Sequence, residues 1–564
     1  MGNASGDMPG RDDLHNRGAY ALSMSKVHFL PELFHLLYVL RQIERLHIIP
    51  VLHLEGIPQE QFAQVECCGS SKSWSPEARL VETWNEPGMV KLRVAEEDGI
   101  YGYAVPERDS EILHLNPVVE KEFLSACIKK NRQSSNLSSA SKHSNFGHSN
   151  TLNKYAKTIY IMSYVDLNYL PRNDLVCEFY LEPAKGLSIK EAAEHIAGES
   201  SVGTWTEVST STPRIRKMAA KVFSIKGNHV KIAYPQELFE PGNMPQIMSS
   251  IAGNIFGMKA VENLRLKDIN FPKDIAKSFK GPEVGLDDLR KITGIKGRPI
   301  LGTIYKPKLG LNPKEMEELA YKVYSAGLDY TKDDENLTSM GFNRFEDRVH
   351  RILGVADRIR SEQGRTVIYA ANITAPAQEM LKRAQFVKDH GGKCIMIDIM
   401  TAGWSGLQYI REQNLGLIIH AHRAMHAAMT RNPKHGISML AIAKAARLCG
   451  VTALHAGTVV GKMEGPKEEV IAIDNFLKSD FYGMKKVMPI ASGGLHPRLV
   501  PDLLKILGND LVITFGGGLW GHPGGPESGV RAIRQAAEAA VQRILLEEYA
   551  KTHTELAEAL KQWN

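Results

Sequence analysis

Residues 326–336 read AGLDYTKDDEN and place a lysine directly before three acidic residues. Asp333, Asp334 and Glu335 carry the oxygen ligands that a hard cation such as Mg²⁺ prefers. An ammonium group has hydrogen-bond donors and no acceptor, so a charged Lys332 would repel a cation instead of binding it. The stretch is therefore either an ordinary surface ion cluster or a site in which Lys332 does not act as an ammonium.

A chemical modification would reconcile the lysine with its neighbours. Residues i and i+2 of a strand share a face, so Lys332 and Asp334 would point together, and Glu335 could join them where the strand ends. A desolvated, neutral lysine amine can add CO₂ and become a carbamate, which is an anionic oxygen ligand. With two carboxylates, it would form the oxygen-rich, water-completed site that Mg²⁺ prefers. The alternative is a lysine paired with Asp333 or Asp334, and this stretch alone favours neither reading.

Polar residues also follow most other apolar runs in the second half of the chain. A single histidine or lysine at such a place is usually structural or solvated, but here the pattern recurs at nearly every run. The recurring residues are Lys306 and Lys308, Asn372, His422, Arg423, His426, His455, Lys462, Ser492-Gly493-Gly494 and Gly516-Gly517-Gly518. Glycine-rich turns expose backbone N–H groups that bind anions. Several cationic side chains in addition predict a small molecule with two phosphates.

The elements that must position these residues alternate regularly from about Gly297. Eight apolar runs of strand length each precede a helical segment, within about 250 residues. That count and length predict a (β/α)₈ barrel, with a doubly wound open sheet as the weaker alternative. In such a barrel the active site lies at the carboxyl ends of the strands, where the polar residues occur.

A smaller α+β domain is predicted before the barrel, over residues 162–285, with the barrel at 286–564. Residues 174–184 and 221–235 have strand patterns, the latter as two strands joined by Gly227-Asn228, and 188–200 is helical. Residues 243–261 are also predicted to be helical. Upstream, residues 1–128 form an extension of unknown role with two strand-like runs, VKLRVAEE and GIYGYAV. A Ser/Asn-rich linker follows at 129–161.

Bulk composition excludes several classes of protein. The net charge of +6 over 564 residues gives no concentrated basic face for nucleic acid. Six cysteines without C-x-x-C spacing indicate reduced thiols, and no segment is long and apolar enough to span a bilayer. The start has no basic n-region typical of a signal peptide. We therefore expect a soluble, cytoplasmic protein that binds neither nucleic acid nor membranes.

The motifs together resemble a known family. GLDYTKDDEN, TIYKPKLGL, HRAMHA, HAGTVVGKMEG, ASGGLH and FGGGLWGHPGG occur in the order found in the large chain of ribulose-1,5-bisphosphate carboxylase/oxygenase (RuBisCO). AGESSVGTW and GNIFGMKA are similar to motifs of that family's N-terminal domain. The resemblance runs from about residue 163 to near the end and is nearest the forms that work without a small subunit. It implies carboxylation of ribulose-1,5-bisphosphate, with O₂ competing, to give two molecules of 3-phosphoglycerate.

The resemblance also implies roles for individual residues. Lys332 would be the carbamylated lysine, formed with activating CO₂, and would bind one Mg²⁺ together with Asp334 and Glu335. Lys306 would act as acid and base, assisted by Lys308 and His422. Lys462, on a mobile loop, would stabilise the new carboxylate and pair with Glu199.

The same resemblance assigns the substrate contacts and an assembly. One phosphate would be held by Arg423, His455 and Ser492. The second phosphate and the sugar would be held by Gly494, Gly516, Gly517, Thr204, Trp205 and Asn254. Because the family's small-domain residues come from a neighbouring subunit, a homodimer or an oligomer of dimers is implied. Two positions depart from the usual pattern, Ile304 where many relatives carry threonine, and Thr514 before FGGG.

The sequence also allows other functions for the protein and two explanations of its N-terminal extension. A relative that only enolises or isomerises a related sugar phosphate typically lacks part of the carboxylation set, especially the loop lysine, which is present here as Lys462. A non-catalytic sugar-phosphate-binding protein would not need a metal triad facing that lysine. The extension before Met162 is either an appended module or the result of a wrongly assigned start codon.

Overall fold

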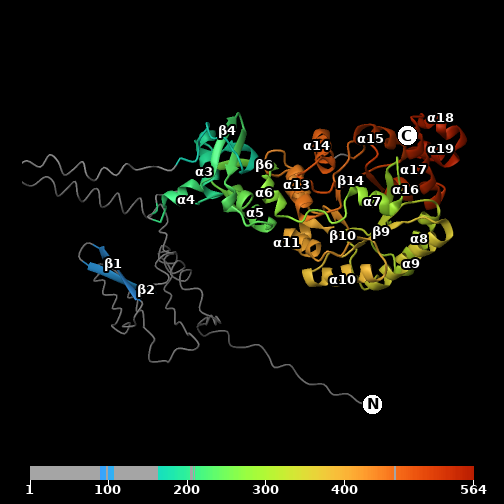
Figure 1. The fold of residues 1–564 in the computed structure, drawn as a ribbon, viewed down its shortest axis with the longest axis horizontal. Helices are drawn as coiled ribbons and strands as arrows, with labels where there is room; N and C mark the ends of the chain where they lie inside the picture. The colour runs from blue at the N-terminus through green and yellow to red at the C-terminus, as the bar shows by residue number, and fades with distance from the viewer. Residues whose placement is uncertain (1–88, 97–98, 107–162, 204–207, 209, 463–464) are drawn as a thin grey trace, which may run out of the picture. The chain divides into compact units, whose positions relative to one another are not determined.

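The computed structural model describes residues 89–96, 99–106, 163–203, 208, 210–462 and 465–564 (Figure 1). The chain divides into two compact units, Met1–Tyr155 and Ala156–Asn564. In the first unit, strands β1 (Met89–Glu96) and β2 (Gly99–Pro106) form an antiparallel pair. They coincide with the two strand-like runs seen in the sequence. The predicted linker at 129–161 lies outside the described residues.

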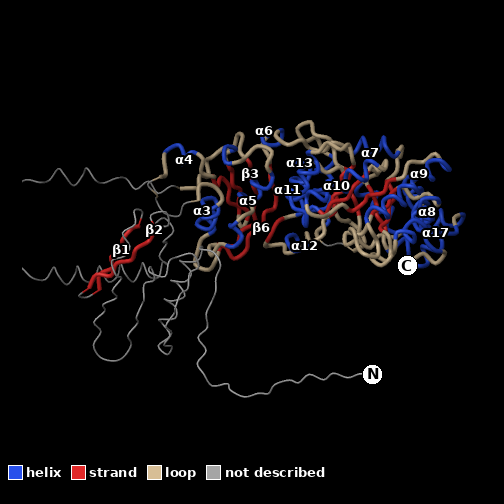
Figure 2. Tube along the Cα trace, turned by 90° about the horizontal axis from the view of Figure 1, so that it is seen from below, coloured by secondary structure: helices blue, strands red, loops and turns tan. Residues whose placement is uncertain are grey.

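The second unit contains a closed barrel of eight parallel strands, which confirms the predicted fold class. Closure is made by β15 against β7, where Val512 pairs with Ile300 and Phe515 with Thr303. Figure 2 shows these strands in red among blue helices. The barrel strands are β7 (Ile300–Ile304), β8 (Tyr330–Lys332), β9 (Ile368–Asn372), β10 (Cys394–Asp398), β11 (Ile418–His422), β13 (Ala453–His455), β14 (Met488–Ala491) and β15 (Val512–Phe515).

Helices alternate with these strands along the chain. Local sequence explains where several begin and end: Asn312 forms a capping box with Glu315 before α8, and Gly364 ends α9 in the left-handed region with φ 63°. The helices that follow the strands are α8 (Pro313–Ser325), α9 (Phe345–Gln363), α10 (Ala377–Asp389), α11 (Ile399–Glu412), α13 (Met439–Cys449), α14 (Lys467–Lys478), α15 (Val500–Leu507) and α17 (Gly525–Gln542). Shorter or terminal helices are α6 (Lys273–Lys277), α12 (Ala427–Thr430), α16 (Gly517–Trp520), α18 (Leu546–Tyr549) and α19 (Thr554–Gln562).

The amino-terminal end of the barrel is filled by apolar side chains. The first residues of the strands, among them Ile300, Ile368 and Val512, form one buried cluster with Leu286 and Leu289 of α7 (Leu286–Thr293). This packing closes that end of the barrel. The opposite end, where the strands finish in Lys332, Asn372, Asp398, His422 and His455, is left for polar chemistry, as expected for this fold.

The small domain is built on a five-stranded sheet in the order β12-β6-β3-β5-β4. Helix α3 (Ile189–Glu199) follows β3 and is capped by Ser188 with Glu191. Strand β12, from the barrel half of the chain, pairs in parallel with β6 and so ties the two domains together. The sheet strands are β3 (Leu175–Pro183), β4 (Lys221–Lys226), β5 (His229–Tyr234), β6 (Val261–Asn270) and β12 (Gly436–Ile437), and the other helices are α4 (Pro213–Lys217) and α5 (Met244–Ile251).

The prediction of one helix over 243–261 was too long. Helix α5 ends at Ile251, a 3₁₀ turn covers Asn254–Gly257, and β6 begins at Val261. Gly253 has φ −85° and ψ −122°, outside the helical region, and a Cβ atom there would lie 2.0 Å from the carbonyl oxygen of Ser249. The turn therefore needs a glycine. In the described part of the chain no helix is long and apolar enough to cross a membrane.

Candidate active site

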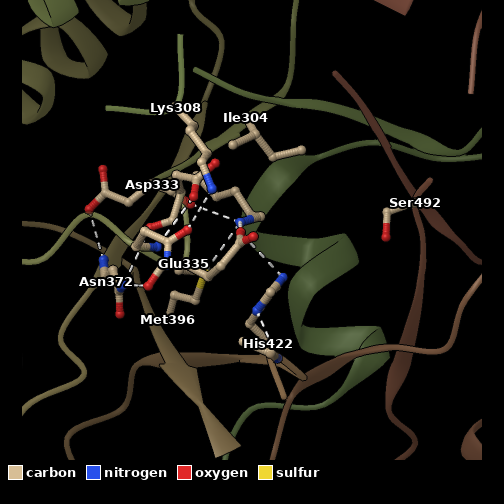
Figure 3. Close-up of polar contacts among 12 residues, drawn as sticks. Ile304, Lys308, Asp333, Glu335, Asn372, Met396, His422 and Ser492 are labelled. Carbon is tan, nitrogen blue, oxygen red and sulfur yellow. Dashed lines mark hydrogen bonds and ion pairs between the residues drawn. The ribbon is translucent and has the colours of Figure 1, made fainter. Parts of the chain in front are cut away.

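Lys332 is the last residue of β8, and its side chain is buried inside the barrel with 1% exposure. Its amine donates a hydrogen bond to the carbonyl oxygen of Asp333 at 2.8 Å. The amine also lies 3.6 Å from the sulfur of Met396 and 3.8 Å from Oε2 of Glu335 (Figure 3). A thioether and one carbonyl are weak partners for an ammonium group, so this pocket stabilises the charged form poorly.

Burial lowers the pKa of Lys332 and outweighs the neighbouring carboxylates, which act to raise it. A larger fraction of the Lys332 amine is therefore neutral here than would be neutral at the protein surface. A neutral amine is the form that can add CO₂. The position of Lys332 thus favours the modified reading of the lysine over the surface ion cluster.

Asp334 and Glu335 follow β8 directly, and each has a charged neighbour at the barrel end. Oδ2 of the buried Asp334 accepts a hydrogen bond from Lys306 at 3.3 Å. Oε2 of Glu335 lies 3.6 Å from Nε2 of His422. Burial acts to raise the pKa of Glu335, but Lys332 and His422 outweigh it, so this carboxyl is held ionised.

These residues fit an oxygen-ligated cation only if the lysine contributes. Among the described residues, no three histidine, cysteine or acidic side chains are close enough together to hold a metal ion. The barrel end supplies two carboxylates, from Asp334 and Glu335, beside a buried amine. A carbamate on Lys332 would provide the third anionic oxygen ligand, and the chemistry of this donor set suits Mg²⁺.

Asp333 has a structural role, unlike Asp334 and Glu335. Its carboxylate accepts hydrogen bonds from Arg348 at 3.2 Å, from the hydroxyl of Tyr369 at 2.7 Å and from the backbone N–H of Asn372 at 2.9 Å. Asp333 and Arg348 are both fully buried. The carboxylate is therefore committed to anchoring the loop after β8 to β9 and α9. Because Arg348 takes this carboxylate, the suggested pairing of Lys332 with the Asp333 side chain is not formed.

His422 is oriented by a residue that the sequence analysis did not select. Nδ1 of His422 donates to Oδ1 of Asp398 at 2.5 Å, and the other ring nitrogen faces Glu335. Asp398 is the last residue of β10 and is buried. The sequence could have identified Asp398 by its position at the end of a strand, because that position identified the candidate residues on the other strands.

A second polar group lies at the ends of β11, β13 and β14. Nδ1 of His455 is 2.9 Å from the hydroxyl of Ser492, and Nε2 of His455 is 2.9 Å from Nε2 of His420. A Cβ atom at Gly457 would lie 3.2 Å from the guanidinium of Arg423, which places that side chain at the same loop. His455, Ser492 and Arg423, predicted as one anion-binding set, therefore come from neighbouring strands of the barrel.

The glycine-rich turns also converge on this end. Gly493 and Gly494 have φ of 111° and 62°, a region that favours glycine, and Cβ atoms at these positions would lie within 3.4 Å of Lys462. Gly516 faces Lys306, and α16 begins at Gly517. Lys308 bonds Asn336 at 3.0 Å, and Ile304 is the last residue of β7. Lys462 is thus brought beside the turn after β14.

The small-domain candidates form a group of their own. Nδ2 of Asn254 lies 3.5 Å from Oε1 of Glu199. Both residues line a cavity of about 720 Å³ whose walls are all small-domain residues, His195 and Lys259 among them. Thr204 and Trp205, also predicted to bind substrate, lie outside the described residues.

Two buried histidines give a pH-dependent contribution to stability. Burial lowers the pKa of His420 and His455 well below the usual value, so both are neutral when folded. Below about pH 6.5 the unfolded chain binds protons that the folded chain excludes, so the free energy of unfolding falls as pH falls, by up to about 1.4 kcal/mol per pH unit for each group. Denaturant unfolding between pH 7.5 and 5.0 measures this slope. His420→Asn should flatten it, and parallel curves would contradict the assignment.

Comparisons with known proteins agree with the geometry. Residues 163–275 match the family described as ribulose bisphosphate carboxylase large chain, N-terminal domain, and residues 285–563 match the catalytic domain of the same large chain. The ribulose bisphosphate carboxylase of Pyrococcus abyssi is 51% identical over 72% of this chain and 97% of that protein. The Methanosarcina barkeri protein of the same name is 47% identical over 71% and 98%.

Solved structures give the same result. The octameric Rubisco of Pyrococcus horikoshii in complex with sulfate has a TM-score of 0.69 at 50% identity, covering 71% of this chain and 96% of that one. The dimeric archaeal Rubisco of Hyperthermus butylicus has a TM-score of 0.67 at 45% identity, covering 71% and 98%. The chain belongs to the ribulose bisphosphate carboxylase large chain family, and the resemblance drawn from its motifs is confirmed.

Proposed function

We propose that the protein is a ribulose-1,5-bisphosphate carboxylase that adds CO₂, with O₂ competing, to the enediol of its substrate. The single observation that carries the proposal is the buried Lys332, whose lowered pKa makes a neutral amine available beside Asp334 and Glu335. The proposal is also supported by archaeal relatives named ribulose bisphosphate carboxylase, which are 47% and 51% identical to this chain. The reaction class would be that of a carboxy-lyase.

Lys332, Asp334 and Glu335 would hold one Mg²⁺, with the lysine present as its carbamate. When bound, the metal would polarise the oxygens of the sugar and stabilise the negative charge that develops on them. The carbamate of Lys332 would remove the C3 proton of the sugar bisphosphate. His422 would be held in one orientation by Asp398 while it exchanges protons with the substrate.

The lysines at the rim would transfer protons and would stabilise the negative charge of the new carboxylate. Lys306, which reaches Asp334, would act as acid and base at the enediol and at the final carbanion. Lys308 would assist it from the same loop. Lys462 would cover the bound substrate, stabilise the carboxylate formed from CO₂ and exclude water from the intermediate.

The phosphates would be bound at two places on the rim. Arg423 and Ser492 would take one phosphate through a guanidinium and a hydroxyl donor, and His455 would complete this subsite by orienting the Ser492 hydroxyl. The second would lie against the backbone of Gly494, Gly516 and Gly517, with Thr204 and Trp205 contributing. Charge-assisted hydrogen bonds of this kind are short and strong.

We infer that two copies of the chain share each site. Glu199 and Asn254 would be supplied by the small domain of the partner, with Glu199 facing Lys462 and Asn254 facing the substrate. The cavity that Glu199 and Asn254 line supports such a role. The assembly would be a homodimer or an oligomer of dimers without a small subunit, consistent with the dimeric and octameric relatives.

The test is fixation of labelled bicarbonate into acid-stable 3-phosphoglycerate. The purified protein is preincubated with CO₂ and Mg²⁺ and then given ribulose-1,5-bisphosphate. We expect product formation that depends on the preincubation. No product from folded, dimeric protein, tested anaerobically and over a range of temperatures, would overturn the proposal and favour an enolase or isomerase acting on a related sugar phosphate.

The Asp398–His422 pair gives a more specific prediction. Asp398→Asn keeps the shape of the side chain but removes the charge that fixes the proton on Nδ1 of His422. We expect kcat for carboxylation to fall about 10- to 100-fold, the usual size of such orienting effects, with a smaller change in KM. Steady-state kinetics measures both constants. An unchanged kcat would show that Asp398 serves only the packing of β10.

A further inference from the structure

A continuous line of hydrogen bonds crosses the interior of the barrel. It begins at the hydroxyl of Tyr330 on β8, which lies 2.7 Å from Nδ1 of His420 on β11. Nε2 of His420 lies 2.9 Å from Nε2 of His455 on β13, and Nδ1 of His455 lies 2.9 Å from the hydroxyl of Ser492 after β14. Three residues on strands and Ser492, in the turn after β14, thus connect the apolar end of the barrel with the proposed phosphate site.

The chemistry of these four groups allows only two arrangements of protons. Tyr330, His420 and His455 are all buried, at 3% exposure or less. Two neutral imidazoles in Nε2–Nε2 contact need one N–H and one lone pair at that contact. Each ring has a single N–H, so the choice at one bond fixes the next, and the whole line must point in one direction.

The two directions differ in what they leave at Ser492. If the Tyr330 hydroxyl donates to His420, then His420 donates through Nε2 to His455, and His455 donates through Nδ1 to Ser492. The hydroxyl hydrogen of Ser492 is then free to donate to a ligand. In the reverse direction Ser492 donates to His455, and its oxygen can offer a ligand only lone pairs, which would repel an anion.

The surroundings of the Tyr330 hydroxyl favour the first direction, in which Tyr330 donates to His420. The only acceptor described near the Tyr330 hydroxyl, apart from His420, is the sulfur of Cys394 at 3.3 Å. A thiol sulfur is a weak acceptor, whereas an imidazole nitrogen is a strong one. The Tyr330 ring also stacks on His420 with centroids 5.7 Å apart and an interplanar angle of 28°, which holds the hydroxyl in line with Nδ1.

We propose that Tyr330 is a positioning residue that fixes the tautomers of His420 and His455 and thereby leaves Ser492 as a hydrogen-bond donor to an anionic oxygen of the substrate. The inference rests on the proposed function in taking that oxygen to belong to a phosphate. Tyr330 itself touches no ligand. It acts from the opposite end of the barrel through two neutral rings.

The main test is Tyr330→Phe, which removes one oxygen atom and keeps the stacked ring. We expect KM for ribulose-1,5-bisphosphate and the dissociation constant of inorganic sulfate, measured by calorimetry without substrate, each to rise about tenfold, the order expected for weakening one hydrogen bond to a charged group, with kcat within about twofold. Tyr324→Phe is the matched control, since its buried hydroxyl bonds Thr331 and Ile368 instead. It should leave both constants unchanged.

A spectroscopic readout makes the test independent of activity. Solid-state NMR of ¹⁵N-histidine-labelled protein distinguishes the tautomers, with signals assigned by comparison with His420→Asn and His455→Gln. Wild type should show His420 protonated at Nε2 and His455 at Nδ1, and Tyr330→Phe should give a mixture. The opposite tautomers in wild type, or unchanged tautomers and KM in Tyr330→Phe, would overturn the proposal.

Cys394→Ala separates the two directions in another way. The proposed direction does not use the sulfur as an acceptor, so this variant should keep the wild-type tautomers and sulfate affinity. The reverse direction requires the sulfur as the end acceptor and predicts a change in both. Because tautomers and sulfate binding are measured without turnover, they remain decisive even if the carboxylase assay fails.

Discussion

Lys332→Ala is expected to abolish carboxylation. The substitution would remove the proposed general base, which contributes about 10²- to 10⁴-fold, and the proposed third metal ligand, which contributes several kcal/mol, so the loss should be at least about 10⁴-fold. The measurement is fixation of labelled bicarbonate after preincubation with CO₂ and Mg²⁺. Mg²⁺-dependent protection against thermal unfolding should disappear in the same variant.

Lys332→Met is the matched control for folding. Methionine has a similar length, and the pocket around the amine is formed partly by the sulfur of Met396. Since burial of the amine opposes its charge, this variant should be as stable as wild type or more stable, and equally inactive. If either variant retained wild-type activity that still required preincubation with CO₂, Lys332 would not be the site of activation.

Arg348→Met should cause the largest loss of stability. Arg348 is fully buried and binds the carboxylate of Asp333, the carbonyl of Thr338 and the side chain of Asn343. Removing one partner of a buried ion pair leaves the other charge uncompensated, so we expect the free energy of unfolding to fall by about 3–5 kcal/mol. Chemical denaturation at a fixed protein concentration measures the change.

Arg351→Met, one turn further along α9, is the surface control. Arg351 also pairs with two acidic residues, Glu317 and Asp347, but its side chain is 38% exposed. Solvent-exposed ion pairs contribute about 0–1 kcal/mol, so this variant should remain close to wild type. The double variant Arg348→Met, Asp333→Asn should recover part of the loss. Equal effects of the two arginine variants would refute the anchoring role of Asp333.

The periodic features of the sequence predicted most of the fold. Strand-length apolar runs alternating with helices identified the barrel, because that pattern follows directly from how each element is buried. The end of α5 and the strand β6 were missed, since the apolar pattern continues past Gly253 and does not reveal the non-helical backbone that brings this residue against Ser249. Glycine in a helical stretch signals such a break only weakly.

The candidate site was predicted unevenly for a similar reason. Residues at strand ends could be selected by position, and Lys332, Asp334, Glu335 and His422 do converge. The different task of Asp333 could not be predicted, because Arg348 comes from a helix whose distance from β8 is set by packing. The Tyr330–His420 contact joins residues 90 positions apart and likewise depends on the closed barrel.

The sulfur of Met396, 3.6 Å from the amine of Lys332, gives the site a vulnerability to oxidants. Oxidation to the sulfoxide would replace a weak acceptor with a strong, polar one and would hold the lysine as its ammonium form. In the proposed mechanism, such a protein could no longer take up activating CO₂. Because Met396 is fully buried, the lesion would accumulate only as the barrel opens locally, and a methionine sulfoxide reductase could reverse it in the same open state. Oxidation of Met396 would therefore first be detected as loss of the proposed activation of Lys332 by CO₂.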